Sequence, residues 1–234
     1  MTSIAWLSDD DSAAFPPVNR ALAEPDGLLA VGGTLSPGRL IKAYEHGVFP
    51  WYAEGQPVLW WSPDPRAVLY PAELHVSRSL RRRMRNAGIE TRLDTAFDAV
   101  IRECSAPRDS GDGTWLTTDM IAAYTQLHAL GLAHSVESWL GGELVGGLYG
   151  VRLGRVFFGE SMFSRTPDAS KIALVRLIEQ AAARGIVLID CQIASAHLQS
   201  LGSRSIPRTE FIALLAQHCR PHQPGSWARS EPAG

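Results

Sequence analysis

The run of residues 157–192 constrains the fold of this chain more than any other part of the sequence. Its apolar residues follow the period of a strand, then that of a helix, and then form a short, wholly apolar run that is typical of a buried strand. The run therefore predicts a strand over residues 155–163, a turn over 164–168, a helix over 169–184 and a strand over 186–189.

Two carboxylates stand in these otherwise apolar strands. Glu160 lies among phenylalanines, and Asp190 directly follows the apolar run 186–189. Burying a carboxylate without a partner is costly, so both acids indicate a functional site rather than packing. The alternatives are an exposed acid on a strand face for Glu160 and a cap of the following helix for Asp190.

The rest of the C-terminal part predicts a mixed α/β organisation. Gly141-Gly142 between two apolar runs indicates a hairpin of antiparallel strands. The tail from Pro221 is expected to be weakly ordered. The expected elements are strands over 134–140 and 143–149, helices over 77–86, 95–106, 118–130 and 208–218, and a short helix ending at 202.

The first sixty or so residues are rich in proline and glycine, which predicts mainly irregular structure. One helix is expected from Ser36, as N-cap, to His46, with Gly47 ending it. We place a domain boundary in the Trp- and Pro-rich segment that follows. The prediction is a small N-terminal α+β domain, residues 1–64, and a larger domain, residues 65–234.

Antiparallel strands followed by a helix and a strand parallel to its predecessor resemble the core of GNAT-type acyltransferases. The expected fold is therefore α+β, with a GNAT-like domain whose mixed, mostly antiparallel sheet is flanked by helices. In that fold a glycine-rich turn before the helix binds the pyrophosphate of acyl-CoA. Here the segment 164–171 has no glycine and contains Pro167 and Asp168, so acyl-CoA is disfavoured as the donor.

Composition excludes several classes of protein. No run reaches the length of a membrane span, and the N-terminus lacks the features of a signal peptide, so we expect a cytoplasmic protein without a membrane partner. Cys104, Cys191 and Cys219 are widely spaced and have no paired ligands around them. They predict inert thiols rather than disulfides or a metal site. His46, His75 and His134 are interpreted as structural.

A basic stripe stands out against the net charge of −2. At helical spacing its four arginines share one face, while Leu80 and Met84 lie opposite. The commoner fate of such a run is a solvated helix face, but four guanidinium groups without an acid also suit phosphate binding. The stripe consists of Arg78, Arg81, Arg82 and Arg85.

Eight segments, in order along nearly the whole chain, resemble one known family: the leucyl/phenylalanyl-tRNA–protein transferases. Each segment alone is weakly specific, but the ordered set is highly specific. The segments are residues 24–33 (EPDGLLAVGG), 47–51 (GVFPW), 60–66 (WWSPDPR), 75–79 (HVSRS), 113–115 (GTW), 134–137 (HSVE), 159–164 (GESMFS) and 189–192 (IDCQ).

The resemblance implies an aminoacyltransferase that moves Leu or Phe, and less readily Met, from aminoacyl-tRNA to an N-terminal Arg or Lys of a protein. The product would carry a destabilising N-terminus that marks it for degradation under the N-end rule. Because the donor ester is already activated, no metal or nucleotide cofactor is expected. Nothing in the sequence indicates an obligate dimer, so we expect a monomer.

Under this resemblance Asp190 is the expected base that takes the proton of the acceptor amine, whose ordinary pKa is about 8. If the extended conformation continues, Gln192 points to the same side as Asp190 and either orients it or contacts the ester carbonyl. Glu160 is expected to bind either the acceptor's Arg or Lys side chain or the amino group of the donor.

The resemblance also implies an apolar pocket for the donor side chain. Such a pocket discriminates poorly between Leu, Phe and Met, because one or two methylene groups are worth only about 1–3 kcal/mol. Leu148 stands where related proteins tend to have Met, which could alter the preference between Leu and Phe. The candidates, which could equally be ordinary core residues, are Leu148, Phe157, Met162 and Ser164.

For the tRNA, Trp51 and Trp115 are the expected stacking platforms of the terminal adenosine, unless they are buried at the domain junction. Burial is the preferred interpretation for Trp60 and Trp61. The basic stripe would hold the acceptor-stem phosphates. Lys171 could contact the 3′ end of the tRNA, but an ordinary surface lysine is the simpler interpretation.

Two other functions compete with this hypothesis. An enzyme with the same core could use acyl-CoA, against which the glycine-free turn argues. A non-catalytic RNA-binding module would use the arginine stripe and the tryptophans, but it would leave Glu160 and Asp190 without a purpose.

Overall fold

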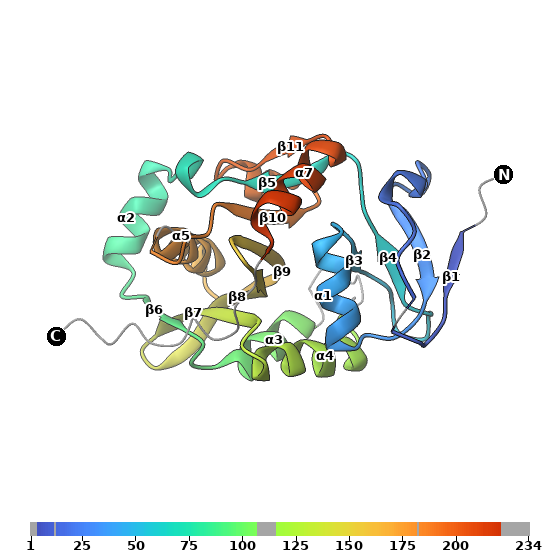
Figure 1. Ribbon diagram of the computed structural model, residues 1–234. Coiled ribbons are helices and arrows are strands. Elements are labelled where there is room, and N and C mark those ends of the chain that lie inside the picture. The colour runs from blue at the N-terminus through green and yellow to red at the C-terminus, as the bar shows by residue number, and fades with distance from the viewer. Residues whose placement is uncertain (1–3, 12, 107–115, 182, 221–234) are drawn as a thin grey trace.

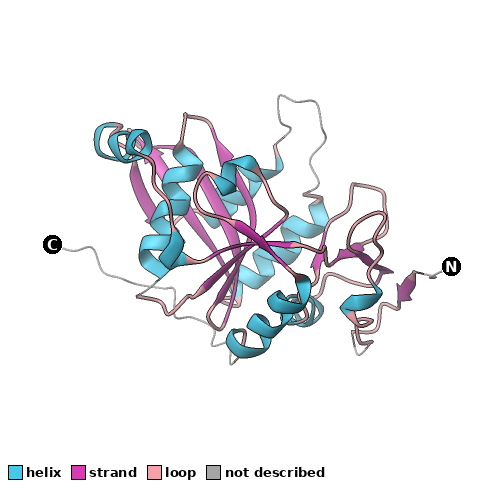
Figure 2. Ribbon diagram, turned by 90° about the horizontal axis from the view of Figure 1, so that it is seen from above, coloured by secondary structure: helices cyan, strands magenta, loops and turns pink. Residues whose placement is uncertain are grey.

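The computed structural model describes residues 4–11, 13–106, 116–181 and 183–220, and it contains two sheets that lie side by side (Figures 1 and 2). Trp115 and the tail from Pro221, both subjects of the predictions above, lie outside the described residues. The predicted α+β class is confirmed, since both sheets occur together with helices, and helices flank the larger sheet.

The N-terminal region forms a four-stranded sheet in the order β1-β2-β4-β3. Long irregular segments separate these strands, as expected, but the expectation did not include the sheet itself. Its strands are only two to five residues long, so no period-2 pattern develops between the proline and glycine turns. The strands are β1 (Ala5–Leu7), β2 (Leu28–Gly32), β3 (Phe49–Pro50) and β4 (Leu59–Trp61).

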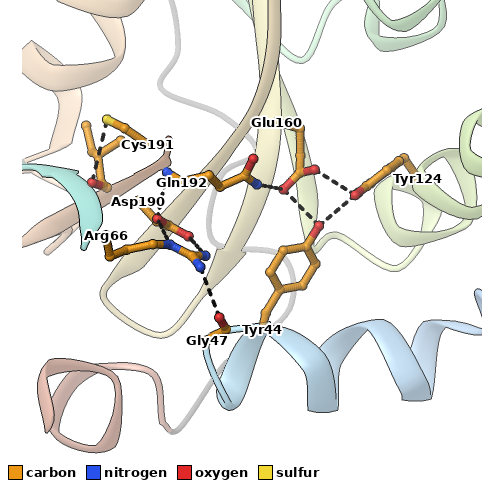
Figure 3. Close-up of polar contacts among 9 residues, drawn as sticks. Tyr44, Gly47, Arg66, Tyr124, Glu160, Asp190, Cys191 and Gln192 are labelled. Atoms are coloured by element: carbon orange, nitrogen blue, oxygen red, sulfur yellow. Dashed lines mark hydrogen bonds and ion pairs between the residues drawn. The ribbon is translucent and has the colours of Figure 1, made fainter. Parts of the chain in front are cut away.

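Helix α1 (Pro37–Glu45) confirms the one helix predicted in this region. The Ser36 side chain caps it by accepting the backbone N–H of Arg39, and Gly47, with φ 71°, follows its end. Tyr44, on the buried face of α1, turns toward the larger sheet (Figure 3). The N-terminal region thereby contributes a side chain to the space between the two sheets.

The larger sheet has seven strands in the order β11-β5-β10-β9-β8-β7-β6. Its pairs are antiparallel except for β9 and β10, which run parallel and are joined through helix α5. This is the predicted GNAT-like order of hairpin, helix and parallel strand. The strands are β5 (Arg66–Leu69), β6 (Glu90–Leu93), β7 (Ala133–Leu140), β8 (Glu143–Leu153), β9 (Val156–Ser164), β10 (Leu188–Gln192) and β11 (Arg204–Ile206).

Helices cover both faces of this sheet. Leu148 and Tyr149 are neighbours on β8 and point to opposite faces, one toward the core packed by α5 and the other toward the core packed by α1, α3 and α4. The predicted helices are confirmed within a few residues. They are α2 (Arg78–Asn86), α3 (Phe97–Ser105), α4 (Thr118–Ala129), α5 (Ala169–Ala181), α6 (Ala196–Gln199) and α7 (Arg208–His218).

Strand β4 belongs to the small sheet and β5 to the large one, so the predicted boundary after residue 64 lies between strands of different sheets. The boundary itself stays a prediction. Within the described residues, no helix is both long and apolar enough to cross a bilayer. None of the three cysteines forms a disulfide within the described residues.

Candidate active site

Glu160 occupies a β-bulge of strand β9. Tyr149 pairs with Ser161 and Gly150 pairs with Gly159, so Glu160 is the extra residue between two pairs. A side chain at Gly150 would place its Cβ 2.2 Å from the Phe158 carbonyl oxygen, which explains the glycine opposite the bulge. The bulge directs the carboxyl of Glu160 toward helices α1 and α4.

The neighbouring strand β10 has a bulge at the same level. Asp190 pairs with Val68 and Gln192 with Ala67, which leaves Cys191 between them. Gln192 has a φ of 60°, so the extended conformation assumed for it is wrong. The ladder between β9 and β10 ends at Asp190 and Phe158. Beyond this pair the strands separate, and the space between them becomes a pocket.

Asp190 is fully buried and forms a two-pronged ion pair with Arg66 (Figure 3). The guanidinium Nε donates to Oδ1 at 2.8 Å, and Nη2 donates to Oδ2 at 2.6 Å. Arg66 also donates to the Gly47 carbonyl oxygen at 3.0 Å and lies between the rings of Phe49 and Phe211. Because Ser195 caps α6, the helix-cap interpretation of Asp190 is wrong.

Both carboxyl oxygens of Asp190 are occupied, which limits its ability to act as a base. Its Oδ1 also accepts the backbone N–H of Gln192 at 2.9 Å, while the Gln192 side chain turns away from it. A base held in this way would have to leave Arg66 before it reached an amine. The contacts therefore favour a positioning role, in which Asp190 fixes the backbone of Gln192.

Glu160 has neutral partners instead. The phenol of Tyr124 donates to one carboxyl oxygen at 2.7 Å and that of Tyr44 to the other at 2.8 Å. The side-chain nitrogen of Gln192 donates at 3.0 Å (Figure 3). Glu160 is only 8% exposed. The alternative interpretation, a solvated acid on a strand face, is therefore excluded.

Burial raises the pKa of Glu160 to about 7, although the two phenol hydrogen bonds act in the opposite direction. The phenol oxygens of Tyr44 and Tyr124 are also only 2.7 Å apart. Two phenolic protons can fill only two of the three contacts among these groups, and a proton on Glu160 supplies the third. Glu160 is thus suited to gain and lose a proton near neutral pH.

The main pocket has a volume of about 460 Å³ and opens between β9, β10, α5 and α6. All four predicted donor-pocket residues line it, namely Leu148, Phe157, Met162 and Ser164. Glu160 and Gln192 line the same pocket. The structure thus brings the predicted side-chain pocket and the titratable carboxyl together. The Cys191 thiol also lines it, but burial raises the pKa of that thiol, which disfavours a thiolate nucleophile.

Backbone N–H groups at the start of α5 donate hydrogen bonds to residues of the preceding turn. Ala169 N–H donates to the Thr166 carbonyl oxygen at 3.1 Å, and Ser170 N–H donates to Ser164 Oγ at 2.8 Å. These amides are therefore not available to a pyrophosphate, in agreement with the argument against acyl-CoA. Lys171 lies nearby and pairs with Asp168 at 3.4 Å.

The predicted tRNA contacts lie around this centre. Trp51 is 41% exposed, and it lines a smaller hollow together with Glu160 and Gln192. Trp60 is fully buried and Trp61 partly so, as expected. The arginines of the basic stripe are exposed on α2 and do not line the main pocket.

Three residues of the site were missed by sequence reasoning: Tyr44, Arg66 and Tyr124. Arg66 stands in the segment WWSPDPR, which carried the resemblance, but nothing local linked it to Asp190, 124 residues away. Tyr44 and Tyr124 lie on the buried faces of their helices, where a tyrosine is normally interpreted as core.

Comparison with known proteins identifies the family. A family model described as leucyl/phenylalanyl-tRNA protein transferase matches residues 68–216, and a model of the N-terminal domain of the same family matches residues 33–64. The chain belongs to the leucyl/phenylalanyl-tRNA–protein transferase family. It is therefore an aminoacyltransferase, with the tyrosines, Glu160 and the Arg66–Asp190 pair at its candidate centre.

Individual members of the family match almost end to end. The leucyl/phenylalanyl-tRNA–protein transferase of Stutzerimonas stutzeri is 57% identical over 224 residues, which cover 96% of this chain and 99% of that protein. The one of Azotobacter vinelandii is 60% identical over 208 residues, covering 89% and 92%.

Solved structures with similar folds are more distant. A GCN5-related N-acetyltransferase from Kribbella flavida has a TM-score of 0.40 at 14% identity, covering 72% of this chain and 60% of that chain. The structure of L-PGS from Bacillus licheniformis has a TM-score of 0.41 at 12% identity, covering 72% and 54%.

Proposed function

We propose that the protein transfers Leu or Phe, and less readily Met, from aminoacyl-tRNA to the N-terminal Arg or Lys of acceptor proteins. The modified proteins are thereby marked for degradation under the N-end rule. The observation that carries the proposal is the joining of an apolar pocket of about 460 Å³ to a carboxyl group whose pKa is raised to about 7. We expect the enzyme to act as a monomer in the cytoplasm.

The donor side chain occupies the apolar part of the main pocket. Leu148, Phe157 and Met162 are its proposed walls, and Ser164 lies at its rim, where its Oγ is bonded to Ser170. The flexible thioether of Met162 lets one pocket adapt to Leu, Phe or Met side chains of different shape. The preference among these donors therefore depends on small packing differences.

Glu160 is the proposed proton acceptor, in place of Asp190. The acceptor amine, in its neutral form, attacks the ester carbonyl carbon, and the bond from that carbon to the ribose oxygen breaks. Glu160 takes a proton from the attacking nitrogen and returns it to the ribose oxygen that leaves. The atoms balance without a further reactant, so no cofactor is required.

Gln192 and Asp190 hold Glu160 and the reacting groups in place. Gln192 donates to Glu160 at 3.0 Å, and Asp190 accepts the Gln192 backbone N–H at 2.9 Å. Arg66 ties this unit to the Gly47 carbonyl of the N-terminal region at 3.0 Å. Glu160 and Gln192 are thus the residues proposed to contact substrate, while Asp190 acts through Gln192.

The tRNA is proposed to bind around the pocket mouth. Trp51, and by resemblance Trp115, stack on the terminal adenosine. The arginines of the basic stripe neutralise acceptor-stem phosphates, which makes binding dependent on salt and largely indifferent to tRNA sequence. Replacing these arginines with alanine should lower activity with aminoacyl-tRNA more than activity with a minimal aminoacyl-adenosine donor.

The decisive experiment mixes the protein with radiolabelled Leu-tRNA and a peptide that begins with Arg. Labelled peptide is expected, and an otherwise identical peptide that begins with Asp should remain unlabelled. A titration with acetyl-CoA should show no binding. Absence of label with the Arg peptide, or transfer from acetyl-CoA, would refute the proposal.

A further inference from the structure

A second, aromatic pocket of about 320 Å³ lies outside the donor pocket. Strands β3 and β4, the segments that follow each of them, and the loop after β10 supply most of its walls. Trp51 and Ile193 are exposed at 41% and 51%. Exposed large apolar side chains beside a pocket are typical of a binding surface. The lining residues that matter here are Asp26, Phe49, Trp51, Trp61, Pro63 and Ile193.

This aromatic pocket is continuous with the reaction centre. A hollow of about 260 Å³ shares Trp51 and Ile193 with the aromatic pocket, and shares Glu160 and Gln192 with the donor pocket. The order in space is therefore donor pocket, Glu160 and Gln192, then aromatic pocket. A molecule whose amine reaches Glu160 from the outer side would place its adjoining side chain in the aromatic pocket.

The charge of the aromatic pocket favours a cation. Among its lining residues in the described parts of the chain, Asp26 is the single charged one. Its Oδ1 accepts the backbone N–H of Asp64 at 3.3 Å, and the Asp64 carboxylate pairs with Arg208 at 3.8 Å, so among the described residues the unpaired negative charge at the pocket is that of Asp26. The indole rings of Trp51 and Trp61 meet edge to face at 5.6 Å, and such rings attract guanidinium or ammonium groups.

We propose that the aromatic pocket binds the side chain of the acceptor's N-terminal Arg or Lys, with Asp26 as the counter-ion. The aliphatic stem packs on the tryptophans and prolines, and the charged head meets Asp26. This assignment rests on the proposed function and deepens it. Glu160 is then left to the α-amino group, so amine activation and side-chain recognition belong to different carboxylates.

The terminal adenosine of the tRNA is the competing occupant, because tryptophans also stack on bases. The RNA chain to which this adenosine belongs is a polyanion, and the negative charge of Asp26 disfavours it here. Trp51 lines both the aromatic pocket and the hollow at Glu160, so it can serve the adenosine from the hollow. Occupancy by the adenosine is an outcome that the experiment detects.

The test compares acceptor peptides that begin with Arg or with citrulline, which has nearly the same shape but no charge. The variant is Asp26→Asn, because the new side chain keeps an oxygen for the Asp64 N–H and loses the charge. We expect the KM for the Arg peptide to rise about tenfold in this variant. The KM for the citrulline peptide, the KM for the donor and kcat should all stay unchanged. Asp26→Lys should raise the KM for the Arg peptide further.

Glu24→Gln is the matched control, since Glu24 is exposed two residues away and does not line the pocket. It should behave as the wild type. Isothermal titration calorimetry with the same two peptides measures acceptor binding without transfer, so it tests the pocket even if no transfer occurs. Wild-type protein that binds both peptides equally, or an Asp26→Asn variant that keeps the preference for Arg, would overturn the assignment. A change in the donor KM alone would assign the pocket to the adenosine and would overturn it too.

Discussion

Asp190 and Glu160 are buried carboxylates of neighbouring strands, and each lies at a β-bulge, yet their partners differ in charge. Asp190 has the guanidinium of Arg66 on both of its oxygens. Glu160 has two phenols and an amide. A cationic partner stabilises the ionised carboxylate, whereas neutral partners only partly offset the cost of burying its charge.

The difference separates a structural charge from a chemical one. The Arg66–Asp190 pair joins the N-terminal region to strand β10 and fixes the backbone on which Gln192 stands. Glu160, with a pKa of about 7, can change its protonation during a reaction at neutral pH. A proton acceptor is most useful when its pKa lies near the working pH, and when its oxygens are not both occupied by a guanidinium group.

The largest effect is expected from Glu160→Gln, which removes the proposed proton acceptor but keeps the shape of the side chain. Loss of a general base typically lowers kcat about 10²- to 10⁴-fold. The measurement is kcat for transfer to an N-terminal Arg peptide at saturating donor. Glu137→Gln is the matched control, since Glu137 is a fully buried acid on β7 that bonds Thr95 and Ser135 away from the pocket. It should cost stability and leave kcat nearly unchanged, and similar kcat losses in both variants would contradict the assignment.

The same Glu160→Gln variant should be more stable than the wild type at high pH. Because the folded-state pKa of about 7 lies above the ordinary value of 4.5, the folded protein binds this proton more tightly than the unfolded chain. Wild-type stability therefore falls as pH rises from about 4.5 to 7, by roughly 2–3 kcal/mol, and the neutral amide avoids this loss. Urea unfolding at pH 5 and pH 8 checks it, and the variant should gain only at pH 8.

Breaking the ion pair between Arg66 and Asp190 should mainly lower the stability of the fold. Arg66→Met leaves Asp190 buried without its counter-ion, and breaking a buried ion pair in this way costs about 3–5 kcal/mol. The free energy of unfolding in urea is the measurement. The double variant Arg66→Met with Asp190→Leu, which buries no charge, should recover much of the loss. If the double variant were no more stable than Arg66→Met, the cost would come from the lost packing of Arg66 on Phe49 and Phe211 instead.

The phenols offer a finer test of the comparison. Each phenol hydrogen bond lowers the pKa of Glu160, and the one from Tyr124 has the larger effect. Tyr124→Phe should therefore shift the rising limb of the pH–rate profile to higher pH, and Tyr44→Phe should shift it less. Tyr149→Phe is the control, because the buried Tyr149 hydroxyl makes no hydrogen bond within the described residues. An unshifted profile in Tyr124→Phe would refute the role of Glu160 as the titrating group.

Sequence reasoning found the elements of the larger sheet because their patterns are long. The hairpin around Gly141-Gly142 and the helix between the two acids follow from local periodicity and turn chemistry. The short strands of the N-terminal sheet were missed because two to five residues cannot establish a period. Their existence depends on pairing with distant segments, such as β1 with β2, which no local pattern encodes.

The partners of the two acids could not be predicted from the sequence either. Sequence identified Glu160 and Asp190 as unusual, but their partners Tyr44, Arg66 and Tyr124 lie 36 to 124 residues away. The bulges at Glu160 and Cys191 are set by register against β8 and β5, so the local alternation could not predict where Gln192 points. The position of an acid was thus predictable, whereas its chemical role required its neighbours.

The smallest effect is expected in the donor pocket, on the α5 face of the sheet. Leu148 is buried and pairs with Met162 across β8 and β9, and both line the pocket. Leu148→Met nearly conserves volume, so stability should change by less than about 1.5 kcal/mol. The longer, more flexible side chain reshapes the wall, and the ratio of kcat/KM for Leu-tRNA and Phe-tRNA should change less than about tenfold. Competition between the two donors in one reaction measures this ratio directly. Because neither carboxylate is touched, the pH–rate profile should stay where it is in the wild type, and a shifted profile would show that the pocket wall and the titrating group are coupled.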